Sequence, residues 1–194
     1  MIKAEIFRKL LNLWAIFIPV LYYKLPSIGS ARLLLFLVTV IIVVIDFFRL
    51  HVNGFKEGFI ILFGSFLRRR ELHQLSGATY LLLGCLITAL LFSRSIVIAA
   101  CTFIIIGDTF AAMLGQNIKS PRIFKKSLIG SLGFFGSNLI SVIVLYGLLD
   151  LPIICLIVGA LSATFFEVLP LPWDDNFSVP ILTGTVMSLL LILI

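Results

Sequence analysis

The residues of this chain that could do chemistry gather between Gly107 and Ser131. Asp108 ends a long apolar run, and an ionised carboxylate there needs a cation, water or a ligand to compensate its charge. On a helix, the small residues three, four and seven positions beyond Asp108 share its face, so that a phosphate or a backbone can approach closely. Four cations follow within the short connection 119–126. These features predict a site for a metal ion and nucleotide phosphates at a membrane surface.

The start of the next predicted helix supplies the second part of this site. Lys125 and Lys126 directly precede Ser127, so two ammonium groups and the free N–H groups of a helix start point to the same place. Such a helix start binds phosphate, although ordinary topogenic charge is the alternative for the two lysines. The predicted nucleotide-binding residues are Lys119, Lys125, Lys126, Ser127, Gly130 and Ser131.

A second acidic group surrounds the proline-rich turn near the carboxyl end. It consists of Glu167, Asp174 and Asp175. Hard divalent ions prefer carboxylate oxygens as ligands, so we expect Asp108, Asp174 and Asp175 to hold Mg²⁺ or another divalent cation. The alternative for the run that begins at Asp174 is capping of the last helix.

Membrane helices must position these residues, because the chain is 61% hydrophobic and 12% charged, with a mean hydropathy of +1.21. We expect an all-α integral membrane protein in which residues 1–194 form a single transmembrane catalytic domain, since the alternation of a β-barrel is absent. Seven apolar runs approach the roughly 20 residues that a crossing helix needs. These spans are about 10–23, 31–50, 78–92, 95–114, 127–149, 151–169 and 177–194.

The charges divide unevenly between the two sides that these spans create. Only Lys24, Arg32 and Arg94 of the fifteen Lys and Arg residues fall on one side. By the positive-inside rule the other side is cytosolic. We therefore expect the amino terminus and the active site to face the cytosol of a cell or organelle membrane, and the carboxyl terminus to lie opposite. The net charge of +6 reflects this topology, and nucleic acid is not an expected partner.

An amphipathic segment separates the second and third spans. Large apolar residues recur at helical spacing from Phe55 to Phe66, and Arg68-Arg69-Arg70 follow. The segment 55–67 is too short to cross, so it predicts a cytosolic-side interfacial helix, with a re-entrant hairpin as the alternative. In the second span, Asp46 and Arg49 are three residues apart, which predicts an ion pair.

The sequence contains no P-loop, GxGxxG or HExxH motif. Acidic and basic side chains at the end of apolar helices instead suit phosphoryl transfer. This reaction depends more on positioning the substrates and neutralising the phosphate charge than on covalent catalysis. At these residues the sequence resembles the family of dolichol kinases, CTP-dependent diacylglycerol kinases and phytol kinases. The similar residues lie within 71–80, 107–115, 125–135 and 163–180, in the family's order, and the resemblance covers nearly the whole chain. Near the amino terminus, Asn12 stands where the family often has a histidine.

The resemblance implies a kinase that transfers the γ-phosphate of CTP to the hydroxyl of a lipid alcohol, of the diacylglycerol, polyprenol or phytol type. A more distant similarity to phosphatidate cytidylyltransferases leaves CMP transfer as an alternative, and a non-catalytic membrane scaffold or transporter is another. The sequence leaves open which lipid alcohol is used, whether CTP or another nucleotide is the donor, and the oligomeric state.

The same resemblance implies roles for individual residues. Asp108, with Asp174 or Asp175, would hold the metal, while Lys125, Lys126 and Ser127 would bind the triphosphate. Glu167 or His73 would position or deprotonate the lipid hydroxyl. The catalytic candidates are therefore Asp108, Glu167 and His73.

Overall fold

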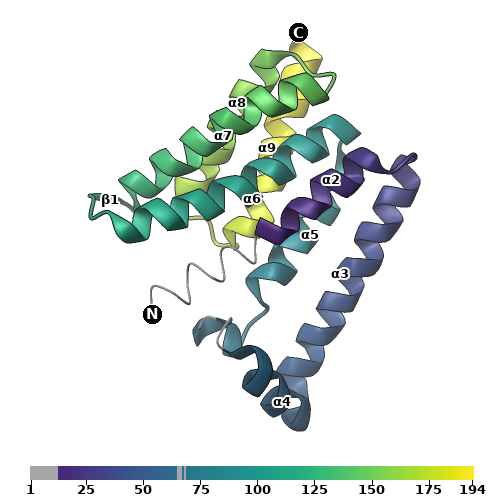
Figure 1. The fold of residues 1–194 in the computed structure, drawn as a ribbon, viewed down its shortest axis with the longest axis vertical. Helices are drawn as coiled ribbons and strands as arrows, with labels where there is room; N and C mark the ends of the chain where they lie inside the picture. The colour runs from purple at the N-terminus through teal and green to yellow at the C-terminus, as the bar shows by residue number, and fades with distance from the viewer. Residues whose placement is uncertain (1–12, 65–66, 68) are drawn as a thin grey trace.

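The fold is described from a computed structural model, which describes residues 13–64, 67 and 69–194. The described chain is built of helices, apart from one small hairpin (Figure 1). The elements in order are η1 (Trp14–Ile16), α2 (Phe17–Lys24), α3 (Ile28–His51), α4 (Asn53–Phe63), η3 (Arg69–Leu72), α5 (Gly77–Leu91), α6 (Arg94–Asn117), β1 (Arg122–Ile123), β2 (Lys126–Ser127), α7 (Leu128–Leu148), α8 (Ile153–Val168) and α9 (Asp175–Leu193).

Four helices, α3, α6, α7 and α9, are long and apolar enough to cross a membrane. The apolar helices α5 and α8 are shorter, with 15 and 16 residues. The first expected span, 10–23, lies partly outside the described residues, and its described part is η1 followed by the eight-residue α2. An all-helical membrane protein is therefore confirmed as the class, whereas seven crossings are not confirmed.

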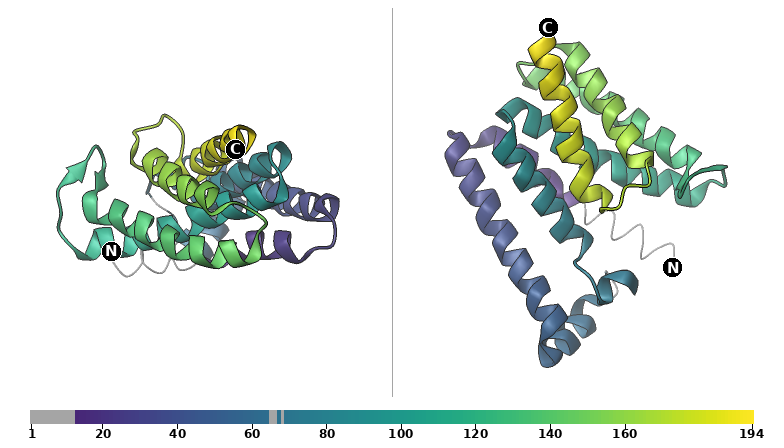
Figure 2. Two further views of the ribbon diagram at one scale, coloured as in Figure 1. Left: turned by 90° about the horizontal axis from the view of Figure 1, so that it is seen from above. Right: turned by 180° about the vertical axis from the view of Figure 1, so that it is seen from behind.

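Helix α6 forms the centre of the bundle. Its residues from Ile96 to Ile105 are all buried, and it contacts α2, α5, α7, α8 and α9. From behind, α9 lies between α5 and α8 (Figure 2). Helix α3 stands at the edge of the bundle, where it packs against α5 and exposes large apolar residues such as Phe36, Ile41 and Phe47. This exposed face of α3 suits contact with lipid.

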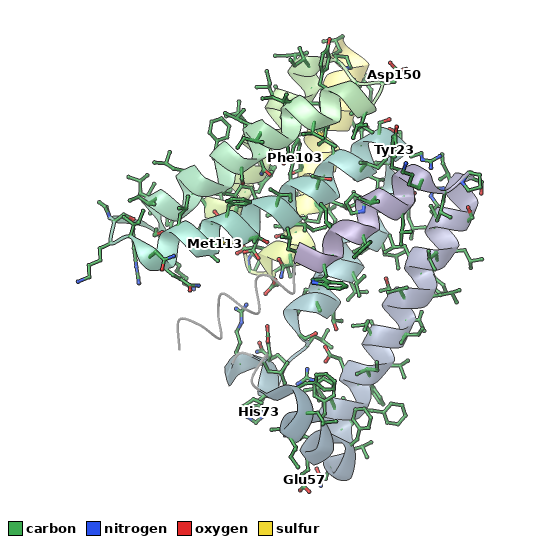
Figure 3. All side chains as sticks on the ribbon, viewed as in Figure 1. Tyr23, Glu57, His73, Phe103, Met113 and Asp150 are labelled. Carbon is green, nitrogen blue, oxygen red and sulfur yellow. The ribbon has the colours of Figure 1, made fainter. Side chains whose placement is uncertain are left out.

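The connections that carry the predicted site residues lie on one side of the bundle. Tyr23 and Asp150 mark one end of the helices, and Met113 and His73 lie toward the other (Figure 3). The hairpin β1–β2, the turn between α8 and α9, and η3 all lie on the side of Met113 and His73 (Figure 1). The fold thus gathers polar residues from three connections at one end of an apolar bundle.

The basic connection 119–126 includes a hairpin that the sequence did not predict. Arg122 pairs with Ser127 and Ile123 with Lys126 in antiparallel register. Phe124, in the two-residue turn, has a φ of 52°, as in the primed turns that join short hairpins. Strands of two residues are too short to show an alternating pattern, so sequence periodicity could not reveal them.

The predicted amphipathic helix is present as α4, slightly earlier in the chain than expected. Its aromatic residues stack along one face, with ring centroids 6.2 Å apart for Phe55 and Phe59 and 5.0 Å apart for Phe59 and Phe63. Ile61 and Leu62 on α4 are 84% and 71% exposed. A short helix with this much exposed apolar surface suits the predicted position in the membrane interface.

Candidate active site

The floor of the candidate site is the close contact between α6 and α7. A Cβ atom added to Gly115 would lie 2.5 Å from the Ser127 Oγ, and one added to Gly130 would lie 3.0 Å from the Ala111 carbonyl oxygen. A side chain at either glycine would force the Ser127 hydroxyl to move and would crowd the backbone of the facing helix. The small residues beyond Asp108 therefore serve close helix packing, which brings the start of α7 against the end of α6.

Ser127 is the N-cap of α7. Its Oγ accepts a hydrogen bond from the Gly130 N–H at 3.0 Å, which satisfies one of the free donors at the helix start. The hydroxyl also lies in the narrow contact with Gly115. The predicted nucleotide-binding Ser127 is thus in place at the site, with its hydroxyl oxygen already engaged by the helix.

Lys126 joins three elements through its side chain. Its Nζ lies 2.7 Å from the Glu167 Oε1 on α8 and 2.5 Å from the Asp175 Oδ2 on α9. Burial disfavours the charge of the Lys126 ammonium, but the two carboxylates more than offset this and raise the pKa of Lys126 above its ordinary value. Lys126 therefore stays protonated and holds the hairpin against α8 and α9.

A cavity of about 330 Å³ opens beside this ion pair. Asp108 lines the cavity, close enough to Glu167 and Asp175 for their charges to interact. Two buried oxygens, Glu167 Oε2 and Ser131 Oγ, have no hydrogen-bond partner among the described residues. Unpaired buried oxygens are costly, so a water molecule or a polar ligand group bound here would satisfy them. The lining from the predicted set is Asp108, Lys125, Lys126, Ser127, Gly130, Ser131 and Glu167.

A second cavity, of about 160 Å³, shares Lys125 and Lys126 with the first. Asp174 lines it, and one of its carboxylate oxygens lies 2.9 Å from a terminal nitrogen of Arg70. Lys125 makes no ion pair with any residue that the structure describes. Arg70 was missed at the sequence level, because it ends a run of three arginines that was interpreted only as membrane-surface charge.

The expected metal ligands do not form a metal site. Asp174 caps α9 by accepting the Asn176 N–H and pairs with Arg70. Asp175 is occupied by Lys126. Within the described chain, no cluster of three or more His, Cys, Asp or Glu could hold a metal ion. Two of the three expected ligands, Asp174 and Asp175, are therefore paired with cations, which does not fit a resident divalent cation held by all three.

Two predicted residues lie outside both cavities. His73 follows η3 and is exposed, and Lys119 is exposed in the connection before β1. Neither belongs to the described lining of either cavity. Of the two candidates for a base, only Glu167 therefore faces the site.

Comparison with known proteins gives three relatives that span most of the chain. The chain is 34% identical over 182 residues to the uncharacterized protein RP860 of Rickettsia prowazekii, covering 90% of this chain and 88% of the relative. Proteins named CTP-dependent diacylglycerol kinase 1 are 28% identical in Eremothecium gossypii and 26% identical in Saccharomyces cerevisiae. These alignments cover 95% and 96% of this chain, and 67% and 73% of the relatives. No family model and no solved structure matches the chain.

Proposed function

We infer the function from one premise: the chain belongs to the family of the Rickettsia prowazekii protein RP860 and is a distant relative of two fungal CTP-dependent diacylglycerol kinases. On that premise it is a CTP-dependent lipid kinase, a phosphotransferase with an alcohol group as acceptor. The observation that supports this most directly is the cavity in which Lys126, Glu167 and Asp108 meet beside the start of α7. It combines a cation for phosphate with buried oxygens for a hydroxyl.

The nucleotide is proposed to bind across the two cavities. Lys125 and Lys126 line both of them, so their ammonium groups can contact successive phosphates of one triphosphate. The backbone N–H groups at the start of α7 add further donors. Because phosphoryl transfer depends mainly on charge neutralisation and alignment, this set supports a kinase.

The lipid hydroxyl is proposed to bind at the two unpaired oxygens. The Glu167 Oε2 would accept the hydroxyl proton, and the Ser131 Oγ would orient the hydroxyl oxygen. The hydroxyl oxygen then bonds to the γ-phosphorus as the bond from that phosphorus to the bridging oxygen of CDP breaks. The proton passes to Glu167, which leaves a phosphorylated lipid and CDP.

We propose diacylglycerol as the first acceptor to test, because it is the substrate that the names of both fungal relatives state. Polyprenol and phytol present the same single hydroxyl on a long apolar body. The active site is proposed to face the cytosol, where CTP is available, with the carboxyl terminus on the opposite side of the membrane.

The experiment is phosphate transfer by the purified full-length protein. CTP or ATP, labelled at the γ-phosphate and supplied as the magnesium salt, is offered with diacylglycerol, undecaprenol or phytol. We expect labelled lipid when CTP is offered with diacylglycerol. We also expect Asp108→Asn to abolish this transfer, because the substitution removes a negative charge from the lining of the cavity. Transfer of CMP instead, or no transfer with any pair, would contradict a lipid kinase.

A further inference from the structure

The end of α3 carries a buried ion pair that holds the connection between α4 and α5. Arg49 is 1% exposed, and its Nε donates to the Asp46 Oδ1 at 2.8 Å, as the spacing of the two residues predicted. The other Asp46 oxygen accepts from the Ser76 N–H at 2.7 Å and the Thr79 hydroxyl at 2.6 Å. Desolvation largely offsets the attraction within such a buried pair, so stability alone does not explain it. The pair instead fixes where α5 begins.

The remaining nitrogens of Arg49 bind the backbone just after Arg70. They donate to the Glu71 carbonyl oxygen at 2.5 Å and to the Gln74 carbonyl oxygen at 2.9 Å. A planar guanidinium fixes two acceptors in one geometry, which a lysine cannot do. The backbone that carries Arg70 is therefore anchored to α3, and Arg70 is placed at the second cavity.

In the second cavity, the Arg70 side chain makes only a weak ion pair. It is 54% exposed and pairs with Asp174. An exposed ion pair of this kind contributes about 0–1 kcal/mol, so a phosphate with two parallel hydrogen bonds to the guanidinium can replace the carboxylate. Lys126 is already held by Glu167 and Asp175. Lys126 can contact a phosphate only while it keeps these two partners, so Lys125 and Arg70 are the cations of this cavity that a phosphate can engage most fully.

We propose that Arg70 binds a phosphate of the nucleotide in the second cavity, and that Arg49 is the positioning residue that holds Arg70 there. Asp174 is the counter-ion of Arg70 when no nucleotide is bound. This inference rests on the proposed function, because it takes a nucleotide as the phosphate donor.

Trp173 provides a direct measure of binding in this cavity. It lines the cavity, is 64% exposed, and is one of two tryptophans in the chain. In the full-length protein with Trp14→Phe, quenching of Trp173 fluorescence is titrated with the magnesium salt of CTP and, separately, with CMP. This readout requires no catalysis.

We expect Arg70→Ala to raise the Kd and the KM for CTP about 10- to 100-fold, as for the loss of a hydrogen bond to a charged group. Binding of CMP, which lacks the outer phosphates, stays unchanged. Lys56→Ala on α4 is the matched control, because it removes one cation outside both cavities. Asp174→Asn keeps an N-cap side chain and releases Arg70, so CTP binds at least as tightly as to the parent protein.

Arg49→Lys tests the positioning role through a double-mutant cycle. Lysine cannot hold both carbonyls, so CTP binding weakens, and adding Arg70→Ala causes little further loss. Fully additive losses would show that Arg49 does not act through Arg70. If Arg49→Lys does not fold, the Arg70 and Asp174 variants still decide whether Arg70 binds phosphate.

The outcomes separate this inference from the proposed function. If the parent protein transfers γ-phosphate but Arg70→Ala binds CTP as tightly as Lys56→Ala, only this inference is wrong. If the parent protein neither responds to CTP nor transfers phosphate, both are wrong. An equal loss of CTP and CMP binding in Arg70→Ala would also contradict a role in binding the outer phosphates.

Discussion

At the scale of single residues, the ammonium of Lys126 organises the site. It contacts carboxylates from α8 and α9 while its own backbone lies in the hairpin before α7. Three segments separated along the chain therefore meet at one charge. The same contacts leave the Glu167 Oε2 without a hydrogen-bond partner among the described residues, in a side chain that lines the first cavity.

Replacing Glu167 tests its role as the base. We expect Glu167→Gln to lower kcat by about 10²- to 10⁴-fold, as for the loss of a general base, with little change in the KM for CTP. The measurement is steady-state transfer of labelled phosphate to lipid. Glu57→Gln, which alters an exposed glutamate on α4, is the control. A wild-type kcat in Glu167→Gln would contradict the role.

Removing the charge of Lys126 leaves Glu167 and Asp175 without their shared cation. We expect Lys126→Gln to lower the free energy of unfolding by about 2 kcal/mol, less than for a fully buried pair because Lys126 is partly exposed. Lys125→Gln, which breaks no ion pair within the described chain, is the control. Thermal or denaturant unfolding in detergent measures the difference.

The pH dependence of this difference has a definite sign. The pKa of Lys126 is raised in the folded protein, so its stabilisation is fully present below the unfolded value of about 10.4 and is lost only as pH rises toward the folded value. The stability difference between the parent protein and Lys126→Gln should therefore stay constant from about pH 8 to pH 9.5. A decline of the Lys126 contribution within that interval would contradict the raised pKa.

At the scale of elements, the contact between α6 and α7 sets the distance across the site. Gly115 and Gly130 let the two helices approach at the point where the hairpin delivers Lys126. Asp108 on α6 and Ser131 on α7 then line the same cavity. The glycines thus set the helix spacing beside the cavity that they also line.

A methyl group at Gly115 would displace the Ser127 hydroxyl and crowd the Gly130 backbone. We expect Gly115→Ala to destabilise the protein by about 1–3 kcal/mol, as for overpacking of a closely packed contact, and to reduce transfer. Gly136→Ala on α7 is the control, since nothing lies within 4 Å of its added Cβ, and alanine there should be neutral or slightly stabilising. Melting curves and transfer assays on both variants check the prediction. If Gly115→Ala and Gly136→Ala had the same stability and the same transfer rate, the contact between α6 and α7 at Gly115 would have room for a methyl group.

At the scale of the whole molecule, polar residues gather at one end of an apolar bundle. A separate apolar groove of about 540 Å³ lies between α2, α6 and α7. Ile106 and Phe110 line that groove, each about 200° around α6 from Asp108 by helix geometry. The groove and the Asp108 carboxylate therefore lie on opposite faces of α6.

The proposed orientation is testable by cysteine labelling. The three native cysteines, Cys85, Cys101 and Cys155, are buried, so they give little background with a membrane-impermeant maleimide. We expect an exposed cysteine in the α7–α8 connection, from Asp150→Cys, to react only from the non-cytosolic side. Lys119→Cys, before the hairpin, should react only from the cytosolic side. Labelling of both from the same side would rule out this topology.

The sequence by itself determined the membrane class, the main helices and the residue types at one end of them. Hydropathy and helical spacing are local properties, so they predicted α3, α6, α7 and α9 closely. The residue types at the helix ends, together with the family resemblance, identified Asp108, Lys126 and Glu167 as candidates. The seven crossings that hydropathy predicted are not confirmed, since α5 and α8 are shorter than the four helices that are long enough to span.

Only the tertiary structure decided which charged groups meet. Lys126 bridges Glu167 and Asp175, 41 and 49 positions away, and Arg70 reaches Asp174 over 104 positions. Such pairs depend on how helices pack and on where a short hairpin turns, which no local pattern records. For this reason Asp174 and Asp175, two of the carboxylates expected to hold a metal, are instead paired with cations, and Arg70, which resembled ordinary surface charge, lies at the second cavity.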